Sequence, residues 1–204
     1  HELKTPLAVI DMALHKRRGQ DEQTEGYVDR AINNMKAILD RCAQTDRLVE
    51  RPFEIQRQRF DLAVRLQQWQ GEHKGASGRL QLLGSATAEL ESDLQCVQII
   101  VSNLIDNALK YADPQQPVEM TLLPQAHADG RSGWSLRVCN APGPAGWPQP
   151  GQVFAKYYRS PSAQRQSGTG LGLFLSHNLA AQLGGQLSYC PDSHHICFEL
   201  WLPA

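Results

Sequence analysis

The 204-residue sequence lacks any apolar run of about 18 residues and any signal-peptide pattern. It also lacks an excess of either charge, because it contains 20 Lys and Arg residues and 21 Asp and Glu residues. A net charge of −1 gives no electrostatic support for nucleic-acid binding. The five cysteines form no C-x-x-C pair and no metal-ligand spacing with histidine. We therefore expect reduced core thiols in a cytoplasmic setting.

The composition is that of a globular chain, with 41% hydrophobic and 20% charged residues. Apolar residues recur at helical spacing over 3–14 and 28–49, separated by the polar segment 19–26, and Pro52 ends the second run. Two such helices, packed only against each other, would leave much of their apolar stripes exposed. We expect residues 1–51 to form a helical hairpin that pairs with a second copy in a dimeric four-helix bundle. The alternative is a hairpin packed on its own downstream domain.

The remainder predicts a linker at 52–60 and a mixed domain at 61–204. Asp61 is placed to cap a helix over 62–72. A longer helix carries apolar residues from Leu94 to Ala108 on one face. Strands are expected at 55–60, 80–83, 118–123, 134–139, 186–190 and 196–202, with a further helix at 173–183. The fold class is therefore α+β.

Three polar residues form a stripe on the longer helix. Asn103, Asn107 and Lys110 lie at i, i+4 and i+7, so they share one side of the helix. An amide oxygen is a hard ligand suited to Mg²⁺, and a nearby lysine can meet phosphate oxygens. The alternative interpretation is a solvated helix face.

Glycines alternate in the stretch 167–173, at Gly168, Gly170 and Gly172. A glycine turn that opens a helix gathers free N–H groups at the positive end of the helix dipole, which suits phosphate. Leu171 and Leu173 would tie this turn to the core. The alternative is a tight turn that packs a helix against a sheet.

The first residues carry a candidate nucleophile. Neutral imidazole at His1 is nucleophilic near pH 7, and Glu2 is placed to accept or orient its proton. Thr5 lies one helical turn further, where its hydroxyl could position a water for a reverse, hydrolytic reaction. A lone histidine is otherwise a solvated surface residue.

Four sequence motifs occur in an order that resembles that of the motifs in sensor histidine kinases. They are the histidine box at 1–7, the asparagine box at 103–111, the aromatic box at 154–159 and a glycine box at 167–173. The resemblance covers nearly the whole chain. It implies a phosphoacceptor hairpin followed by an α/β sandwich of the gyrase–chaperone–histidine kinase ATPase type.

The resemblance also implies residue roles in a site for ATP and Mg²⁺. It implies that Asn107 ligates the metal, that Asn103 and Lys110 face the phosphates, and that Tyr111 packs near the nucleotide. Arg159 would reach the γ-phosphate, with a surface cation as the alternative. The glycine box would contribute Gly168, Thr169, Gly170, Leu171, Gly172 and Leu173.

The sequence departs from the family at Asn140. The family has D-x-G-x-G there, whose aspartate accepts a hydrogen bond from the adenine amino group, whereas this chain has 140–144 as Asn-Ala-Pro-Gly-Pro. Asn140 can still accept through its amide oxygen, but it is neutral. Pro142 and Pro144 supply no N–H. We predict that adenine is bound more weakly or in a different way.

The resemblance implies a kinase that phosphorylates His1 from Mg-ATP and passes the phosphoryl group to an aspartate of a response regulator. Its partners would be a second copy, bound through residues 1–51, and a receiver domain, with no nucleic acid. Membrane attachment would come only from missing upstream segments, so this chain would be the cytoplasmic portion of an inner-membrane protein. Two alternatives stay open. One is a nucleotide-impaired, phosphatase-biased relative acting through Thr5, and the other is a gyrase- or chaperone-like ATPase.

Overall fold

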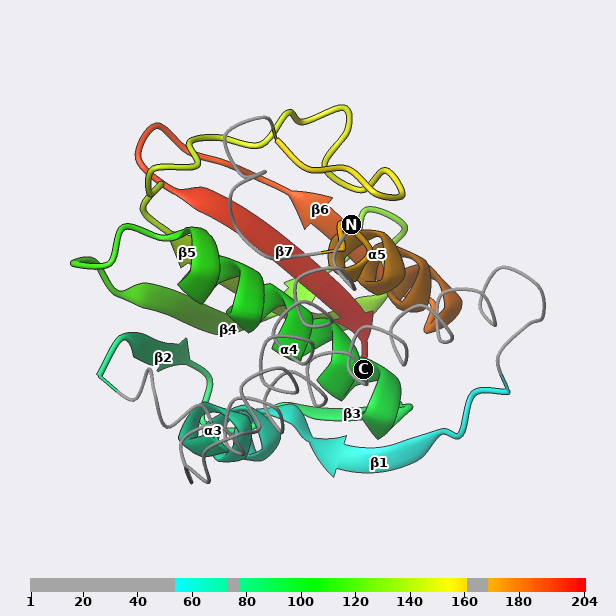
Figure 1. Ribbon diagram of the computed structural model, residues 1–204. Helices are drawn as coiled ribbons and strands as arrows, with labels where there is room; N and C mark the ends of the chain where they lie inside the picture. Colours follow the sequence, from blue (N-terminus) through cyan, green and yellow to red (C-terminus); the bar gives the residue numbers. More distant parts are fainter. Residues whose placement is uncertain (1–53, 73–77, 161–168) are drawn as a thin grey trace, which may run out of the picture. The chain divides into compact units, whose positions relative to one another are not determined.

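The computed structural model describes residues 54–72, 78–160 and 169–204 (Figure 1). The predicted hairpin at 1–51 lies outside these residues. By their contacts, residues 54–165 and 172–204 form one compact unit, to which residues 166–171 do not belong. Residues 169–171 are therefore described separately.

The centre of the unit is a five-stranded sheet in the order β2-β4-β5-β7-β6. Its strands are β2 (Leu80–Gly84), β4 (Val118–Ala126), β5 (Ser132–Asn140), β6 (Gln186–Tyr189) and β7 (Ile196–Pro203). β2 runs parallel to β4, and every other neighbouring pair is antiparallel. The predicted strands are confirmed, although β4 and β5 extend beyond the predicted ranges, because their hairpin pairs from Val118↔Asn140 to Ala126↔Ser132.

A second, two-stranded sheet pairs β1 (Gln58–Asp61) with β3 (Glu89–Ser92). β1 confirms the strand predicted at 55–60, which forms the end of the segment 52–60 that we expected to be a linker. β3 was not predicted, because four residues of mixed polarity carry little periodic signal. The helix α3 (Leu62–Glu72) follows β1 directly, and Asp61 caps it by accepting from the N–H of Ala63 at 2.8 Å, as expected.

Two helices, α4 (Leu94–Tyr111) and α5 (Gly172–Gln182), cover one face of the larger sheet (Figure 1). Alternation along β4 shows which face this is. Val118, Met120 and Leu122 are fully buried beneath the helices, whereas Leu123 is 50% exposed. The mixed α+β sandwich predicted for this region is confirmed. Among the described residues, no helix combines the length and apolar character needed to cross a membrane.

The structure corrects our expectation that all the cysteines are reduced. Cys139 of β5 and Cys197 of β7 are partners in the strand register and form a disulfide. Their Cα atoms lie 4.2 Å apart, the short separation of a non-hydrogen-bonded pair in an antiparallel sheet. The residues are 58 positions apart in the sequence, so only the strand register brings them together. Cys96 and Cys190 are free thiols.

Candidate nucleotide site

The helix α4 carries most of the predicted site, and Asp93 fixes its start. Oδ1 of Asp93 accepts from the N–H groups of Gln95 and Cys96, both at 3.0 Å, and Oδ2 accepts from Gln56 at 2.9 Å. Burial alone would raise the pKa of Asp93. The backbone donors, Cys96 first, favour the charged form and hold the pKa below its ordinary 3.8. The helix therefore begins on a buried carboxylate that is ionised near neutral pH.

Asn103 is buried and points at α5. Its Nδ2 donates to Oγ of Ser176 at 3.2 Å and, weakly, to the carbonyl of Gly172 at 3.5 Å. A Cβ atom added at Gly172 would lie 3.4 Å from Oδ1 of Asn103. The amide thus holds α4 against the first two turns of α5, and a Cβ atom at Gly172 would be in ordinary van der Waals contact with it.

Asn107 lies one turn further along α4, next to the same glycine. Its Nδ2 is 4.0 Å from a Cβ position at Gly172. Within the described residues no hydrogen bond engages the Asn107 carboxamide, which is half-buried. Lys110 follows, with its Nζ 4.8 Å from the ring centre of Tyr111. The structure therefore places Asn107, Lys110 and Tyr111 in the last two turns of α4.

A short segment ties the end of β5 to the end of α4. The N–H of Gly143 donates to the carbonyl of Tyr111 at 2.9 Å, and the N–H of Asp113 donates to Ala141 at 3.0 Å. A Cβ atom at Gly143 would collide with the Tyr111 carbonyl at 2.8 Å. The segment that replaces the expected glycine-rich motif is therefore held on α4, with glycine required at one position.

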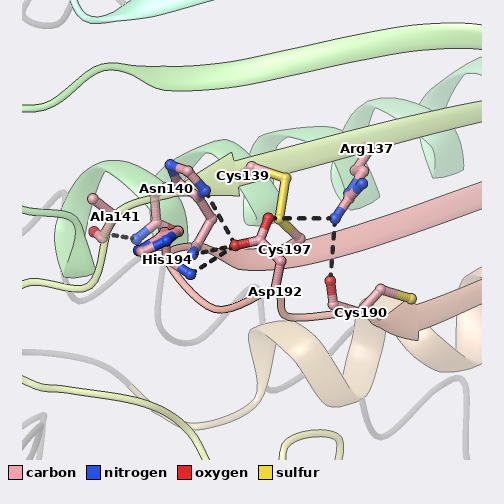
Figure 2. Close-up of a disulfide and its surroundings, with 9 residues drawn as sticks. Arg137, Cys139, Asn140, Ala141, Cys190, Asp192, His194 and Cys197 are labelled. Atoms are coloured by element: carbon pink, nitrogen blue, oxygen red, sulfur yellow. Dashed lines mark hydrogen bonds and ion pairs between the residues drawn. A yellow bond between two sulfur atoms is a disulfide. The ribbon is translucent and has the colours of Figure 1, made fainter.

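Asn140 sits where this segment begins, and it is 3% exposed. Its Nδ2 donates to the carbonyl of Ala141 at 2.9 Å (Figure 2). This bond orients the carboxamide, and no hydrogen bond to its Oδ1 is present among the described residues. The orientation supports an acceptor role at Asn140, although the side chain carries no charge.

The aromatic segment continues from there and packs on the sheet. Phe154 stacks on His177 of α5, with ring centres 4.6 Å apart, and meets Phe198 of β7 edge-on. The hydroxyl of Tyr158 accepts from the N–H of Gln149 at 2.9 Å. These contacts anchor residues 149–158. Arg159 follows them and is half-buried.

The glycine box is described only in part. The N–H of Leu171 donates to Oγ1 of Thr169 at 3.2 Å, and Gly170 has a φ of 67°. That backbone conformation is one that glycine adopts at no steric cost. Gly168 lies outside the described residues, as do His1, Glu2 and Thr5. Leu173 lies in the first turn of α5, directly after Gly172.

Sequence reasoning missed two residues that organise the site. Ser176 receives the Asn103 amide, and its only signal was its position four residues after Gly172, on one side of a helix. Asp93 was missed as a helix cap, although an aspartate just before an apolar helical pattern is a recognised start signal.

A magnesium ion fits the donor chemistry of Asn107. The described residues hold no cluster of three or more His, Cys, Asp or Glu side chains that could bind a metal unaided. Mg²⁺ typically uses one or two protein oxygens, keeps several waters and shares the phosphates of a nucleotide. A single uncommitted amide oxygen beside a lysine suits that mode.

Comparison with known proteins identifies the fold and the family. Residues 92–204 match the family described as histidine kinase-, DNA gyrase B- and HSP90-like ATPases. The chain is 31% identical over 216 residues to the swarming motility regulation sensor protein RssA of Serratia marcescens. That alignment covers all of this chain but only 45% of the relative, so the chain spans about half its length.

Two solved structures share the fold. The Acinetobacter baumannii histidine kinase AdeS superposes with a TM-score of 0.76 at 16% identity, covering 100% of this chain and 97% of that chain. Full-length ShkA in complex with AMPPNP gives a TM-score of 0.67 at 21% identity, covering 100% of this chain and 45% of that one. Given the family match over more than half of its residues, the chain belongs to the histidine kinase-, DNA gyrase B- and HSP90-like ATPase family, and its relatives there are sensor histidine kinases.

Proposed function

We propose that this chain is the core of a sensor histidine kinase that transfers the γ-phosphoryl group of Mg-ATP to His1 and then to an aspartate of a response regulator. The observation that carries the proposal is the contrast between two asparagines one turn apart. The Asn103 amide is committed to α5, whereas the Asn107 carboxamide has no hydrogen-bond partner among the described residues. A half-buried amide left open beside a lysine is suited to a ligand.

The residues around Asn107 have different roles in nucleotide binding. Lys110 supplies positive charge for the phosphates, one turn beyond the amide. Asn103 acts as a positioning residue, because its bond to Ser176 sets the distance between α4 and the start of α5. The first N–H groups of α5 supply further donors for anionic oxygens. Mg²⁺, when bound, neutralises charge on the phosphates.

At the other end of the nucleotide, Asn140 would hold the base. Its Oδ1 accepts no hydrogen bond among the described residues and can accept from the amino group of adenine. A neutral acceptor forms a weaker hydrogen bond than a carboxylate. The phosphate end of ATP would therefore contribute a large share of the affinity.

Phosphoryl transfer would use the first residues of the chain. An imidazole nitrogen of His1 attacks the γ-phosphorus, the bond to the bridging oxygen breaks, and ADP leaves. Glu2 accepts the imidazole proton. Thr5 would position a water for hydrolysis in the reverse direction. Catalysis of this kind relies chiefly on positioning and charge neutralisation.

The partners follow from the same proposal. A second copy would pair through residues 1–51, and a receiver domain would dock on that hairpin. RssA is about twice as long as this chain, which would form the cytoplasmic portion of a protein of the inner membrane.

The test is labelling with ATP that carries a radioactive γ-phosphate. Wild type should become labelled, and Asn107→Ala should reduce labelling strongly. Asn178→Ala is the matched control, because within the described parts of the chain its amide bonds only to the carbonyl of Phe174, in its own helix, at 2.7 Å. Equal labelling of Asn107→Ala and wild type would contradict the metal-ligand role.

A phosphatase-biased relative is the second candidate, and the segment at 140–144 motivates it. It predicts weak labelling by ATP together with rapid loss of phosphate from a phosphorylated regulator, abolished in Thr5→Ala. Robust labelling of wild type excludes it. A gyrase-like ATPase would instead turn over ATP without labelling, but the position where those proteins carry a glutamate holds Asn103.

A further inference from the structure

Three cysteines form a row across β5, β7 and the end of β6. Cys139 of β5 is bonded to Cys197 of β7, and Cys190 directly follows β6. The N–H of Cys190 donates to the carbonyl of Cys197 at 2.9 Å, so these residues are also opposite one another. Figure 2 shows the disulfide bridging β5 and β7, with Cys190 at the end of the adjacent strand.

The row lies on the sheet face that α4 and α5 do not cover. Along β5, Leu136 and Val138 are buried beneath the helices, and Cys139 has the opposite orientation. Cys139 and Cys190 are both half-buried, whereas Cys197 is fully buried. A reductant approaching this face would therefore meet Cys139 as the accessible partner of the disulfide.

The free thiol in the row does not open the disulfide by itself. Burial raises the pKa of Cys190, and the negative charge of Glu199 raises it further, against a smaller opposing effect of Arg137. Cys190 is thus protonated near neutral pH, and a thiol is a poor nucleophile compared with a thiolate. Opening the disulfide therefore calls for an external reductant.

The disulfide is one residue away from the proposed base-binding end of the nucleotide site. Asn140 follows Cys139 directly and pairs with Ile196, the first residue of β7. From Asn140 the chain continues into the segment that is hydrogen-bonded to the end of α4. The covalent link therefore holds the pair of residues next to Asn140↔Ile196, the last pair between β5 and β7.

We propose that the Cys139–Cys197 disulfide is a reversible redox site, reduced by a dithiol protein, whose state sets the nucleotide affinity of the domain. The coupling to affinity rests on the proposed function, and the redox chemistry does not. In the oxidised state the strand ends are ordered before a nucleotide binds. In the reduced state they fray, so binding must order them and affinity falls.

The reduction is a two-step exchange. A thiolate of the reductant attacks Sγ of Cys139, the S–S bond breaks, and Cys197 leaves as a thiolate that takes up a proton. The second thiol of the reductant then attacks the mixed disulfide, releases Cys139 as a thiol and leaves as an intramolecular disulfide. Two electrons and two protons pass to the protein.

The test compares wild-type chain before and after treatment with dithiothreitol, followed by reoxidation with oxidised glutathione. Alkylation and peptide mass spectrometry should find Cys139 and Cys197 protected before treatment and modified after it. The dissociation constant of a non-hydrolysable ATP analogue should rise about fivefold on reduction, the lower end of typical coupling between sites, and return on reoxidation.

Two half-buried cysteines of the same row give matched variants. Cys139→Ser should show the weak, reduced-state affinity under all conditions, whereas Cys190→Ser should respond to dithiothreitol as wild type does. Free Cys139 in untreated protein would overturn the redox site. An intact disulfide whose reduction leaves analogue binding unchanged would overturn the coupling. Failure of both states to bind the analogue would count against the proposed function, while the alkylation result would still decide the redox site.

Discussion

Replacing Asp93 with alanine should destabilise the domain from the start of α4, without touching any proposed nucleotide ligand. The carboxylate accepts three backbone N–H groups, two in the first turn of α4 and one from Gln56. Loss of a helix N-cap costs about 1–2 kcal/mol. Loss of the bond from Gln56 to a charged acceptor adds about 1.5 kcal/mol. We expect the free energy of unfolding to fall by about 3 kcal/mol.

Urea unfolding followed by circular dichroism measures this loss, with an unchanged m value as evidence that the folded state is intact. The midpoint of thermal unfolding should fall by roughly 6–12 °C for a domain of this size. Asp113→Ala is the matched control, because its carboxylate accepts one exposed N–H among the described residues, from Gln115 at 2.9 Å. That variant should stay within about 0.5 kcal/mol of wild type. Equal effects of the two substitutions would refute the reasoning.

The same carboxylate predicts a pH dependence. The pKa of Asp93 is below 3.8 in the folded chain, so the unfolded chain binds its proton more readily. Its contribution to stability is therefore complete above about pH 4 and is lost as the pH falls through the folded pKa. The difference in stability between wild type and Asp93→Asn should be constant near neutral pH and should shrink below pH 3.8. A difference that grows on acidification would contradict this assignment.

Three further substitutions test separate parts of the account. Gly143→Ala should weaken binding of an ATP analogue and lower the melting temperature, because its Cβ would lie 2.6 Å and 2.8 Å from backbone oxygens at the end of α4. Unchanged binding and an unchanged melting temperature would contradict the contact between Gly143 and the end of α4. Asn140→Asp should tighten ATP about fivefold, since a carboxylate accepts a stronger hydrogen bond; affinity that does not improve would contradict the role assigned to Asn140. Cys139→Ser should lower the free energy of unfolding by about 4 kcal/mol without reductant, the loop-closure entropy for 58 residues, and by much less with reductant; equal effects in both conditions would show that the disulfide does not stabilise the fold.

Periodicity predicted most of the described fold. α3 was placed to the residue, because Asp61 marks its start and an apolar stripe follows. The strands of the larger sheet were predicted from alternating apolar and polar residues and from the turn residues between them. β3 was not found, because it is held by pairing with β1 rather than by a pattern of its own.

The site was less accessible to sequence reasoning where it depends on contacts between distant segments. The stripe of Asn103 and Asn107 was visible at helical spacing, yet nothing in the sequence distinguished the two. Their difference arises because Ser176, 73 residues after Asn103, meets one amide and not the other. The disulfide was missed for the same reason, since the pairing of Cys139 depends on the register of β5 against β7.

The most direct test of the central claim is to locate the phosphoryl group after incubation with Mg-ATP. Wild-type protein should carry one phosphoryl group on His1, found by mass spectrometry under conditions that preserve phosphohistidine. His1→Ala should carry none, whereas His194→Ala, at an exposed turn, should be phosphorylated as wild type is. Phosphorylation of His1→Ala at wild-type level, or ATP hydrolysis with no phosphoprotein in either protein, would contradict the account.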